Sequence, residues 1–150
     1  MRDLLYKIRF GLGSSSGTIL YGVFNTFVVF FYIVELGADP AIIGILWALF
    51  AVWNSANDII SVYINQLLSQ FQRSKTLLLL GAISTFTFLL VWLPAVLNLS
   101  GNLIYIFFFV TISIFDMVHS LVSLNYLSLM PMIFTKEGES QQFLTVKQIV

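Results

Sequence analysis

Four long apolar segments alternate with short polar breaks along the chain. They cover residues 10–34, 40–68, 76–97 and 102–132, and a further segment begins near residue 140. Each of the four exceeds the roughly 20 residues that an α-helix needs to cross a hydrocarbon core of about 30 Å. In the first break, Asp39 is placed to cap a helix that begins at Pro40. The pattern predicts four transmembrane helices and the start of a fifth, without a soluble domain.

Composition places the chain in a membrane. Hydrophobic residues make up 59% of it and charged residues only 9%, against roughly 25% charged in an ordinary soluble domain. Because this small number of polar residues cannot cover a water-facing surface, we expect an all-α integral membrane protein. The first apolar run is too long for a signal peptide and lacks a clear cleavage site of small residues, so it is interpreted as a retained helix.

The basic residues indicate an orientation. They lie before the first predicted helix, between the second and third, and after the fourth, at Arg2, Lys7, Arg9, Arg73, Lys75, Lys136 and Lys147. The loops at 35–39 and 98–102 contain none. Because cytoplasmic loops carry the excess of Lys and Arg, we expect the N-terminus in the cytoplasm. The prediction is a multi-pass protein of the cell membrane.

Polar residues recur on one face of three predicted helices. In the first helix they are Ser14, Thr18, Tyr21 and Asn25, in the second Asn54, Asp58, Ser61 and Asn65, and in the fourth Ser113, Asp116, Ser120 and Ser123, with His119 beside them. Their spacings of three, four and seven residues put each set on one side of its helix. Lipid-facing positions are apolar, so these three helices are predicted to share a polar interior, with the third helix peripheral.

Two carboxylates and one histidine lie deep in the predicted spans. Asp58 is about four residues from the middle of the second span, and Asp116 and His119 are near the middle of the fourth. A charge at such depth costs on the order of 2.5–3.5 kcal/mol on insertion scales. Asp116 and His119 are three residues apart and can pair with each other. Asp58 has no basic residue in its own span, which makes it a candidate for an ion or solute pathway.

Other functions find little support. The hydroxyl and amide side chains can also serve only to join helices by hydrogen bonds. The alternative hypothesis is therefore a small four-helix membrane subunit or assembly factor without transport activity of its own. The segment GLGSSSG at 11–17 lies inside a predicted span and not after a strand, so it is expected to permit close helix packing, not to bind phosphate. There is no nucleophile, base and orienter set for an enzyme, no zinc-ligand spacing around His119, and no basic aromatic surface for nucleic acid.

Several short motifs resemble a transporter family. They are FGLGS at 10–14, FFYxxxLG at 30–37, WxxxND at 53–58, LLLGA at 78–82 and NYLSLMP at 125–131. In order and spacing the chain resembles the glycoside-pentoside-hexuronide:cation symporters of the major facilitator superfamily, which include melibiose permease. The resemblance implies a cation- or proton-coupled symporter of a small polar solute, such as a sugar or glycoside, that works by alternating access.

The resemblance also implies a larger architecture. Members of the family have twelve helices in two six-helix bundles, with a central cavity lined largely by helices 1, 2, 4 and 5 of each half. On this basis the chain is the first part of a six-helix bundle and an N-terminal fragment. Its expected partners are the remaining helices of the transporter, the lipid bilayer and the solute.

Departures from the family pattern leave the solute and the coupling ion open. Ala51, Asn54 and Ile59 replace the arginine, first aspartate and proline of the family's helix 2 motif, whereas Asp58 keeps its acid. Thr18 and Ser123 stand where the family carries a sugar-binding aspartate and an aspartate near the cation. The candidate binding residues are therefore Thr18, Asn25, Asn54, Asp58, Asp116, His119 and Ser123. Sodium held by Asp58, Asn54 and Ser55 and proton coupling through Asp58 both fit, and no other cofactor is expected.

Overall fold

The fold consists of helices throughout the part of the chain that is described. The structure is a computed structural model that describes residues 2–68 and 73–130, with side chains described for 8–68 and 75–130. Its elements are α1 (Arg2–Phe30), the π-helical turn η1 (Phe31–Glu35), α2 (Pro40–Leu68), α3 (Arg73–Val91), α4 (Pro94–Leu97) and α5 (Asn102–Leu127). The predicted all-α character is confirmed for these residues.

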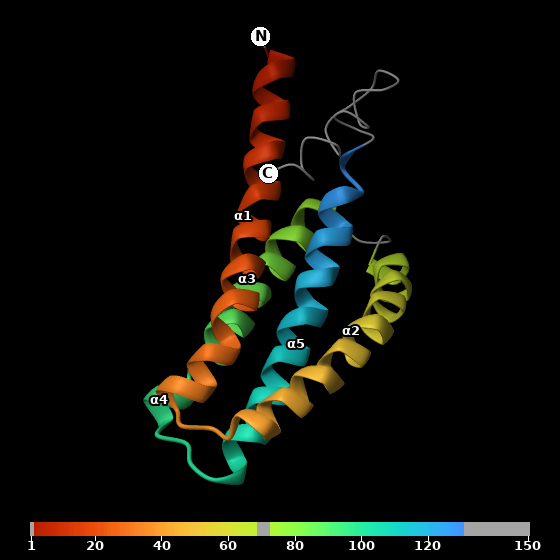
Figure 1. The fold of residues 1–150 in the computed structure, drawn as a ribbon. Helices are drawn as coiled ribbons and strands as arrows, with labels where there is room; N and C mark the ends of the chain where they lie inside the picture. The colour runs from red at the N-terminus through yellow and green to blue at the C-terminus, as the bar shows by residue number, and fades with distance from the viewer. Residues whose placement is uncertain (1, 69–72, 131–150) are drawn as a thin grey trace.

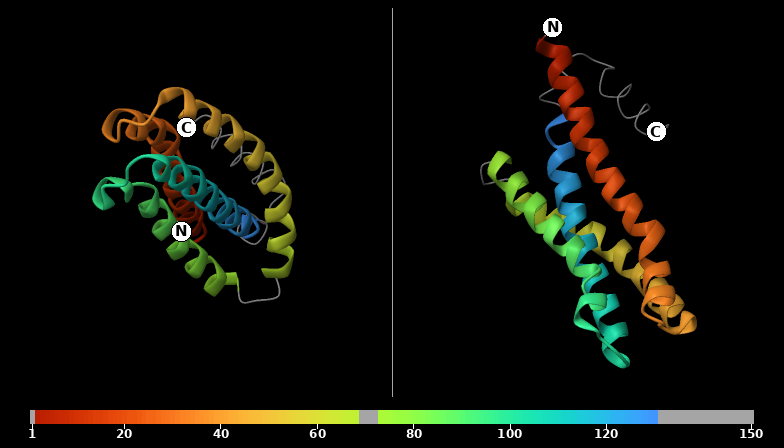
Figure 2. Two further views of the ribbon diagram at one scale, coloured as in Figure 1. Left: turned by 90° about the horizontal axis from the view of Figure 1, so that it is seen from below. Right: turned by 90° about the vertical axis from the view of Figure 1, so that its left-hand side faces the viewer.

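Helix α5 is the centre of the arrangement. Helices α2 and α3 pack along its two sides, and α1 runs beside it, to its left in Figure 1. Viewed end-on, α2 curves around α5 (Figure 2). The start of α1 and the end of α5 lie at one end of the molecule, here called the N-terminal end, and the connections before α2 and α5 lie at the other, here called the loop end.

Within residues 2–68 and 73–130, three helices are long and apolar enough to cross a membrane. They are Ile8–Glu35, Pro40–Leu68 and Asn102–Leu127. The apolar part of α3, Lys75–Val91, is shorter. Together with the large hydrophobic side chains that these helices expose, this agrees with an integral membrane helical bundle, as the composition predicted.

The third predicted span is not one continuous helix, so this prediction was wrong. The expected helix at 76–97 is divided into α3 and α4 by a turn at Trp92 and Leu93. Pro94 explains the break, because its ring and missing N–H prevent it from continuing a helix but suit the first position of a new one. The hydropathy pattern does not register this break, because the turn residues are themselves apolar.

The other boundaries follow the predictions with smaller shifts. Helix α1 begins at Arg2, before the expected start at residue 10, and α2 has the predicted bounds 40–68. Helix α5 ends at Leu127, with the Ser128 N–H bonded to the Leu124 carbonyl, and the predicted end at 132 lies outside the described residues. The predicted fifth segment from about residue 140 lies outside the described residues.

The start of α2 confirms the predicted cap. The Asp39 carboxylate accepts a hydrogen bond from the Ala41 N–H at 2.7 Å, and Pro40 takes the first helical position. The Asp39 N–H in turn donates to the Tyr105 hydroxyl of α5 at 3.0 Å. These bonds fix the direction in which α2 leaves the loop end.

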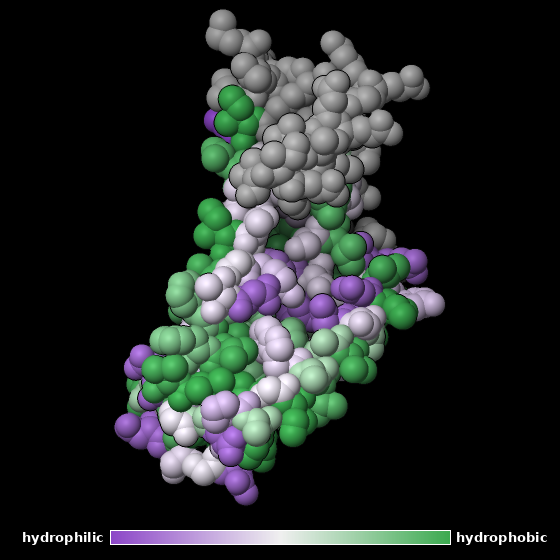
Figure 3. Space-filling view, in the orientation of Figure 1, coloured by the Kyte–Doolittle hydropathy of each residue, from purple (hydrophilic) through white to green (hydrophobic). Residues whose placement is uncertain are grey.

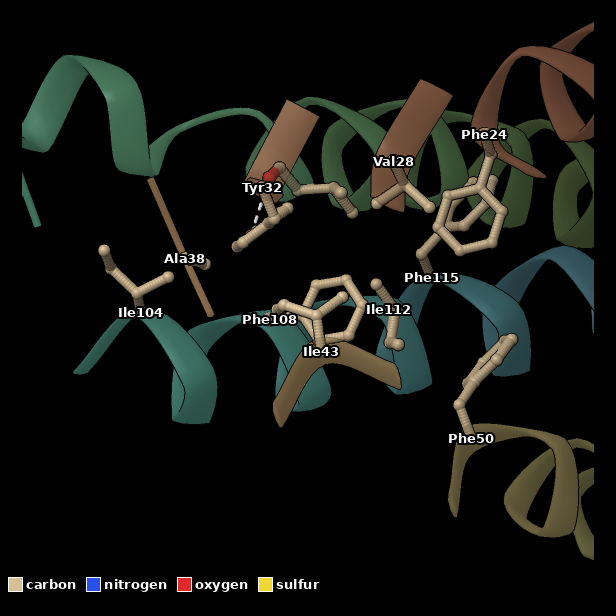
Figure 4. Close-up of a cluster of buried hydrophobic side chains, with 11 residues drawn as sticks. Phe24, Val28, Tyr32, Ala38, Ile43, Phe50, Ile104, Phe108, Ile112 and Phe115 are labelled. Atoms are coloured by element: carbon tan, nitrogen blue, oxygen red, sulfur yellow. Dashed lines mark hydrogen bonds between the residues drawn. The ribbon is translucent and has the colours of Figure 1, made fainter. Parts of the chain in front are cut away.

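An aromatic core fills the loop-end half of the bundle (Figure 4). Its buried residues are Phe24, Val28, Tyr32, Ala38, Ile43, Phe50, Val91, Ile104, Phe108, Ile112 and Phe115. The rings of Phe24 and Phe115 have centroids 4.7 Å apart, which joins α1 to α5. The Tyr32 hydroxyl donates to the Val91 carbonyl at 2.9 Å and ties η1 to the end of α3. All the main helices are therefore held together at this end.

We predict that Gly101→Ala destabilises the fold at the start of α5. Gly101 has φ +62 and ψ −143, a conformation that is essentially restricted to glycine, so a Cβ there costs about 1–3 kcal/mol. The measurement is the free energy of unfolding in detergent. Gly44→Ala in α2 is the control, because nothing lies within 4 Å of its added Cβ and alanine is the better helix former. Equal stability of the two variants would contradict the prediction.

Candidate functional site

A carboxylate lies buried in the middle of the bundle. Asp116, on α5, is 1% exposed. Its Oδ1 accepts a hydrogen bond from the Tyr21 hydroxyl of α1 at 3.1 Å, and its Oδ2 accepts one from the Asn57 amide of α2 at 2.9 Å. Both donors are uncharged. Asp116 therefore joins three helices through neutral partners.

Asn57 connects this carboxylate to further polar groups. Its side chain is fully buried, and its NH₂ group also contacts the Ser120 hydroxyl at 3.3 Å. The Ser61 hydroxyl, one turn farther along α2, donates to the Asn57 Oδ1 at 3.2 Å. The amide oxygen is thus occupied within α2, and the NH₂ group is directed at α5. Because the network lies inside a membrane-spanning bundle, each of these groups needs the partner it has.

The register of α2 explains why Asn57 occupies this place. The buried residues of the helix are Ile43, Phe50, Asn57 and Ser61, so Asn57 continues the core positions at a spacing of seven residues. The predicted inner face of this helix includes Asn54 and Asp58 but does not include Asn57. In the structure Asn54 is half-buried and Asp58 is exposed. The repeat from Ile43 and Phe50 is the signal that could have identified Asn57.

Asp58 lies on the flank of α2 that faces α1. Asp58 is eleven residues, or about three turns, after Trp47 and therefore lies on the same side of α2. The ring centroids of Trp47 and of Phe24 on α1 are 6.2 Å apart, so this side of α2 faces α1. Asp58 is within electrostatic range of both Tyr21 and Asp116. Figure 3 shows hydrophilic surface across the middle of this face, bordered by hydrophobic surface. The exposed acid thus belongs to a polar region beside the buried one.

A cavity of about 240 Å³ lies between α1 and α5. Small residues of α1 form one wall and larger residues of α5 the other. The lining residues are Gly13, Ser14, Ser16, Gly17, Thr18, Tyr21, His119, Val122, Ser123, Tyr126 and Leu127. The Ser16 and Thr18 hydroxyls donate to carbonyls of their own helix, which leaves their oxygens able to accept hydrogen bonds from a ligand.

Two stacked ring pairs lie along the cavity, and both join α1 to α5. The rings of Tyr21 and His119 have centroids 4.9 Å apart and an interplanar angle of 9°. Toward the N-terminal end, the rings of Phe10 and Tyr126 are 4.6 Å apart at 15°, and the Tyr126 hydroxyl donates to the Phe10 carbonyl at 2.6 Å. The cavity therefore has aromatic surfaces as well as hydroxyl groups.

The GLGSSSG segment allows the close approach that the sequence analysis expected, but also forms the cavity wall. A Cβ on Gly13 would collide with the Tyr126 hydroxyl, and one on Gly17 would lie 3.8 Å from the His119 ring. Glycine is therefore needed at position 13 to make room for an α5 side chain, whereas a Cβ at position 17 would make an ordinary contact. The serines between them leave the hollow open.

The predicted site residues fall into two groups. Thr18, His119 and Ser123 line the cavity, and Asp116 is connected to it through Tyr21. A second group lies outside the cavity lining and consists of Asn25, Asn54 and Asp58. The two oxygens of Asp116 accept hydrogen bonds from Tyr21 and Asn57, two partners that the expected pairing with His119 did not include. Of the proposed sodium ligands, Ser55 donates its hydroxyl to the Ala51 carbonyl at 3.2 Å.

This arrangement can bind a small neutral solute that carries several hydroxyl groups. Hydroxyl oxygens and an imidazole can form hydrogen bonds with such a solute, and the ring faces can contact its apolar C–H groups. The buried carboxylate, one hydrogen bond away, is the group whose charge can respond to what occupies the cavity. Binding and charge movement can thus be linked within this site.

Comparison with known families covers almost the whole chain. A family model described as MFS/sugar transport protein matches residues 9–150. The match includes both ring pairs, the cavity and the Asp116 network. No solved structure matches the chain.

We predict that Asn57→Ala destabilises the bundle more than Asn54→Ala does. The first substitution removes a buried donor from Asp116, at a cost of about 1–3 kcal/mol, whereas Asn54 is only half-buried. Free energies of unfolding in detergent test this difference. A larger loss for Asn54→Ala would favour the register of the sequence analysis over that of the structure.

We also predict that Gly13→Ala weakens the contact between α1 and α5. The new methyl group displaces the Tyr126 hydroxyl from the Phe10 carbonyl, and overpacking of this kind typically costs about 1–3 kcal/mol. Gly22→Ala is the matched control on the same helix, because nothing lies within 4 Å of its Cβ. Thermal unfolding of both variants in detergent is the measurement, and an unchanged Gly13→Ala midpoint would show that Tyr126 does not pack as described.

Proposed function

Because the chain belongs to the family of MFS/sugar transport proteins, we propose that it acts as a secondary active transporter that moves a small polar solute, such as a sugar or glycoside, together with a cation or proton. The family establishes an integral membrane transporter of the major facilitator kind. The solute class and the coupling are our inference from the site.

The observation that carries the proposal is the buried carboxylate of Asp116 beside a largely apolar cavity whose lining includes hydroxyl groups and an imidazole. An ionisable group inside a membrane-spanning helix is costly and is usually retained for a solute or ion pathway. Here it is held by neutral donors from α1 and α2, and Tyr21 connects it directly to the cavity. A subunit whose polar groups only join helices needs the interhelical bonds but not the cavity.

The cavity between α1 and α5 is the proposed solute site. Its Thr18, Ser123 and His119 side chains supply hydrogen-bonding atoms, and the rings of Tyr21 and Tyr126 supply surfaces for the apolar faces of the solute. The volume of about 240 Å³ suits one small molecule. A site between helices of a bundle is a common location for ligands.

Asp58 is the proposed point at which the coupling ion enters. It is exposed on the polar flank of α2 and lies within electrostatic range of Asp116. An exposed acid can exchange a proton or attract a cation from water, which a fully buried acid cannot do without an opening motion. Asn54, one turn before Asp58, adds an amide oxygen to this region.

The contrast between the two ends supports alternating access as the transport mechanism. The aromatic core fills the loop end, whereas the cavity lies toward the N-terminal end. If the basic residues place the N-terminal end in the cytoplasm, the arrangement corresponds to an inward-facing state of a cell-membrane transporter. Transport then requires this bundle to rock against the remaining helices of the transporter, so that the cavity is exposed to the two sides in turn.

We predict that Asp58→Asn abolishes accumulation of solute against its gradient while exchange of solute across the membrane persists. The substitution removes the exposed acid but keeps the size of the side chain. Radiolabelled solute uptake into proteoliposomes, with imposed pH or sodium gradients, measures both activities.

Asp39→Asn is the matched control for this experiment. Asp39 is an exposed acid at the loop end whose role is to cap α2, and asparagine caps a helix equally well. We expect its accumulation to equal that of the unaltered protein. Uphill transport that survives undiminished in Asp58→Asn would remove Asp58 from the coupling mechanism.

A further inference from the structure

Building on the transport function proposed above, we propose that Asp116 takes up the coupled proton and that Tyr21 makes this uptake depend on the presence of solute in the cavity. Tyr21 would then be a positioning residue that transmits occupancy to the carboxylate. The inference concerns two residues that the family pattern described above does not assign.

Tyr21 belongs to the cavity and to the buried network at once. Its ring lines the cavity and stacks on His119 at 4.9 Å. Its hydroxyl donates to the Asp116 Oδ1 at 3.1 Å. A solute that forms a hydrogen bond with this hydroxyl therefore competes with Asp116 for the same donor.

The bonds around Asp116 determine which oxygen accepts a proton. Oδ2 receives the Asn57 NH₂ group at 2.9 Å, and an NH₂ group can only donate. The Ser61 hydroxyl donates to the amide oxygen of Asn57, which keeps the NH₂ group turned toward α5. A proton on Asp116 is therefore placed on Oδ1, where the Tyr21 hydroxyl can donate to the ionised acid or accept from the neutral one.

The same partners favour a proton over a sodium ion. Sodium requires several converging oxygen ligands, whereas Asn57 presents its nitrogen to Asp116 and its oxygen to Ser61. The other titratable groups that face this region are Asp58 on α2 and His119 on α5. Helix α3 carries no titratable residue after Lys75. The carboxylate thus has no cationic lysine or arginine facing it from the described parts of these helices.

The proposed step moves one proton. A solute hydroxyl accepts the Tyr21 O–H, and the ionised Asp116 loses one of its two donors. A buried carboxylate without that donor is destabilised, so Oδ1 takes a proton from water at the polar face, where Asp58 is exposed. Release of the solute returns the Tyr21 hydroxyl to Oδ1 and the proton to water.

Calorimetric titration in two buffers of different ionisation enthalpy tests this step, because it reports solute binding and proton uptake together. The probes are the neutral sugars xylose and methyl α-galactoside, added to the purified protein in detergent. We expect about one proton taken up per bound solute in the unaltered protein. Tyr21→Phe and Asp116→Asn should bind the same solute with the proton uptake abolished.

Tyr105→Phe is the matched control. It also removes a tyrosine hydroxyl, but one that lies outside the cavity lining and accepts a bond from the Asp39 N–H at the loop end, so its proton uptake should equal that of the unaltered protein. Normal proton uptake in Tyr21→Phe or Asp116→Asn would overturn the inference and leave the transport function intact. Solute binding that requires sodium and moves no proton would also overturn it. If the unaltered protein binds none of the probes, the proposed function itself fails.

Discussion

The hydrogen bond between Asn57 and Asp116 is the interaction on which the rest of the site depends. A carboxylate in the middle of a membrane-spanning bundle has no water to solvate it, so its oxygens must find donors on neighbouring helices. Asn57 supplies one from α2 at 2.9 Å and Tyr21 supplies the other from α1 at 3.1 Å. These two bonds fix how α1 and α2 are rotated about α5. The cavity wall and the exposed position of Asp58 follow from those rotations.

The interior of the bundle is packed differently at its two ends. At the loop end, rings and branched side chains from α1, α2 and α5 fill the interior. Toward the N-terminal end, glycine and serine residues of α1 leave a hollow against α5, which the ring pairs and the Tyr126 bond cross. In alternating access a bundle of this kind rocks as a unit against the other half of the transporter.

Hydropathy predicted the membrane class and most helix bounds, because the length of an apolar run is a property of the sequence alone. It did not predict the break at Pro94, since Trp92 and Leu93 are apolar whether they are helical or not. The sequence pattern identifies the buried acid Asp116 and indicates His119 as a possible partner, but it does not indicate Asn57. A neighbour at i+3 is visible in the sequence, whereas the contact with Asn57 depends on the rotation of a different helix.

The register of α2 shows why this rotation is hard to predict in a membrane protein. Its lipid-facing side exposes Leu49, Val52 and Ile59, which are as hydrophobic as the buried Ile43 and Phe50. In a soluble protein the exposed side would be polar and would reveal the inner face. Asn57 and Asp58 are adjacent in the sequence, so the pattern allows either side chain to face α5. The prediction placed the ionisable Asp58 on the inner face. The structure assigns the inner position to the neutral amide.

A double-mutant cycle of Asn57→Ala and Asp116→Ala tests this assignment most directly. The two single variants and the double variant are compared with the unaltered protein by their free energies of unfolding in detergent. Because the side chains are in contact, we expect the effects to be non-additive by about 0.5–3 kcal/mol. Effects that add within about 0.5 kcal/mol would contradict the account, because they would mean that Asn57 does not hold the buried carboxylate.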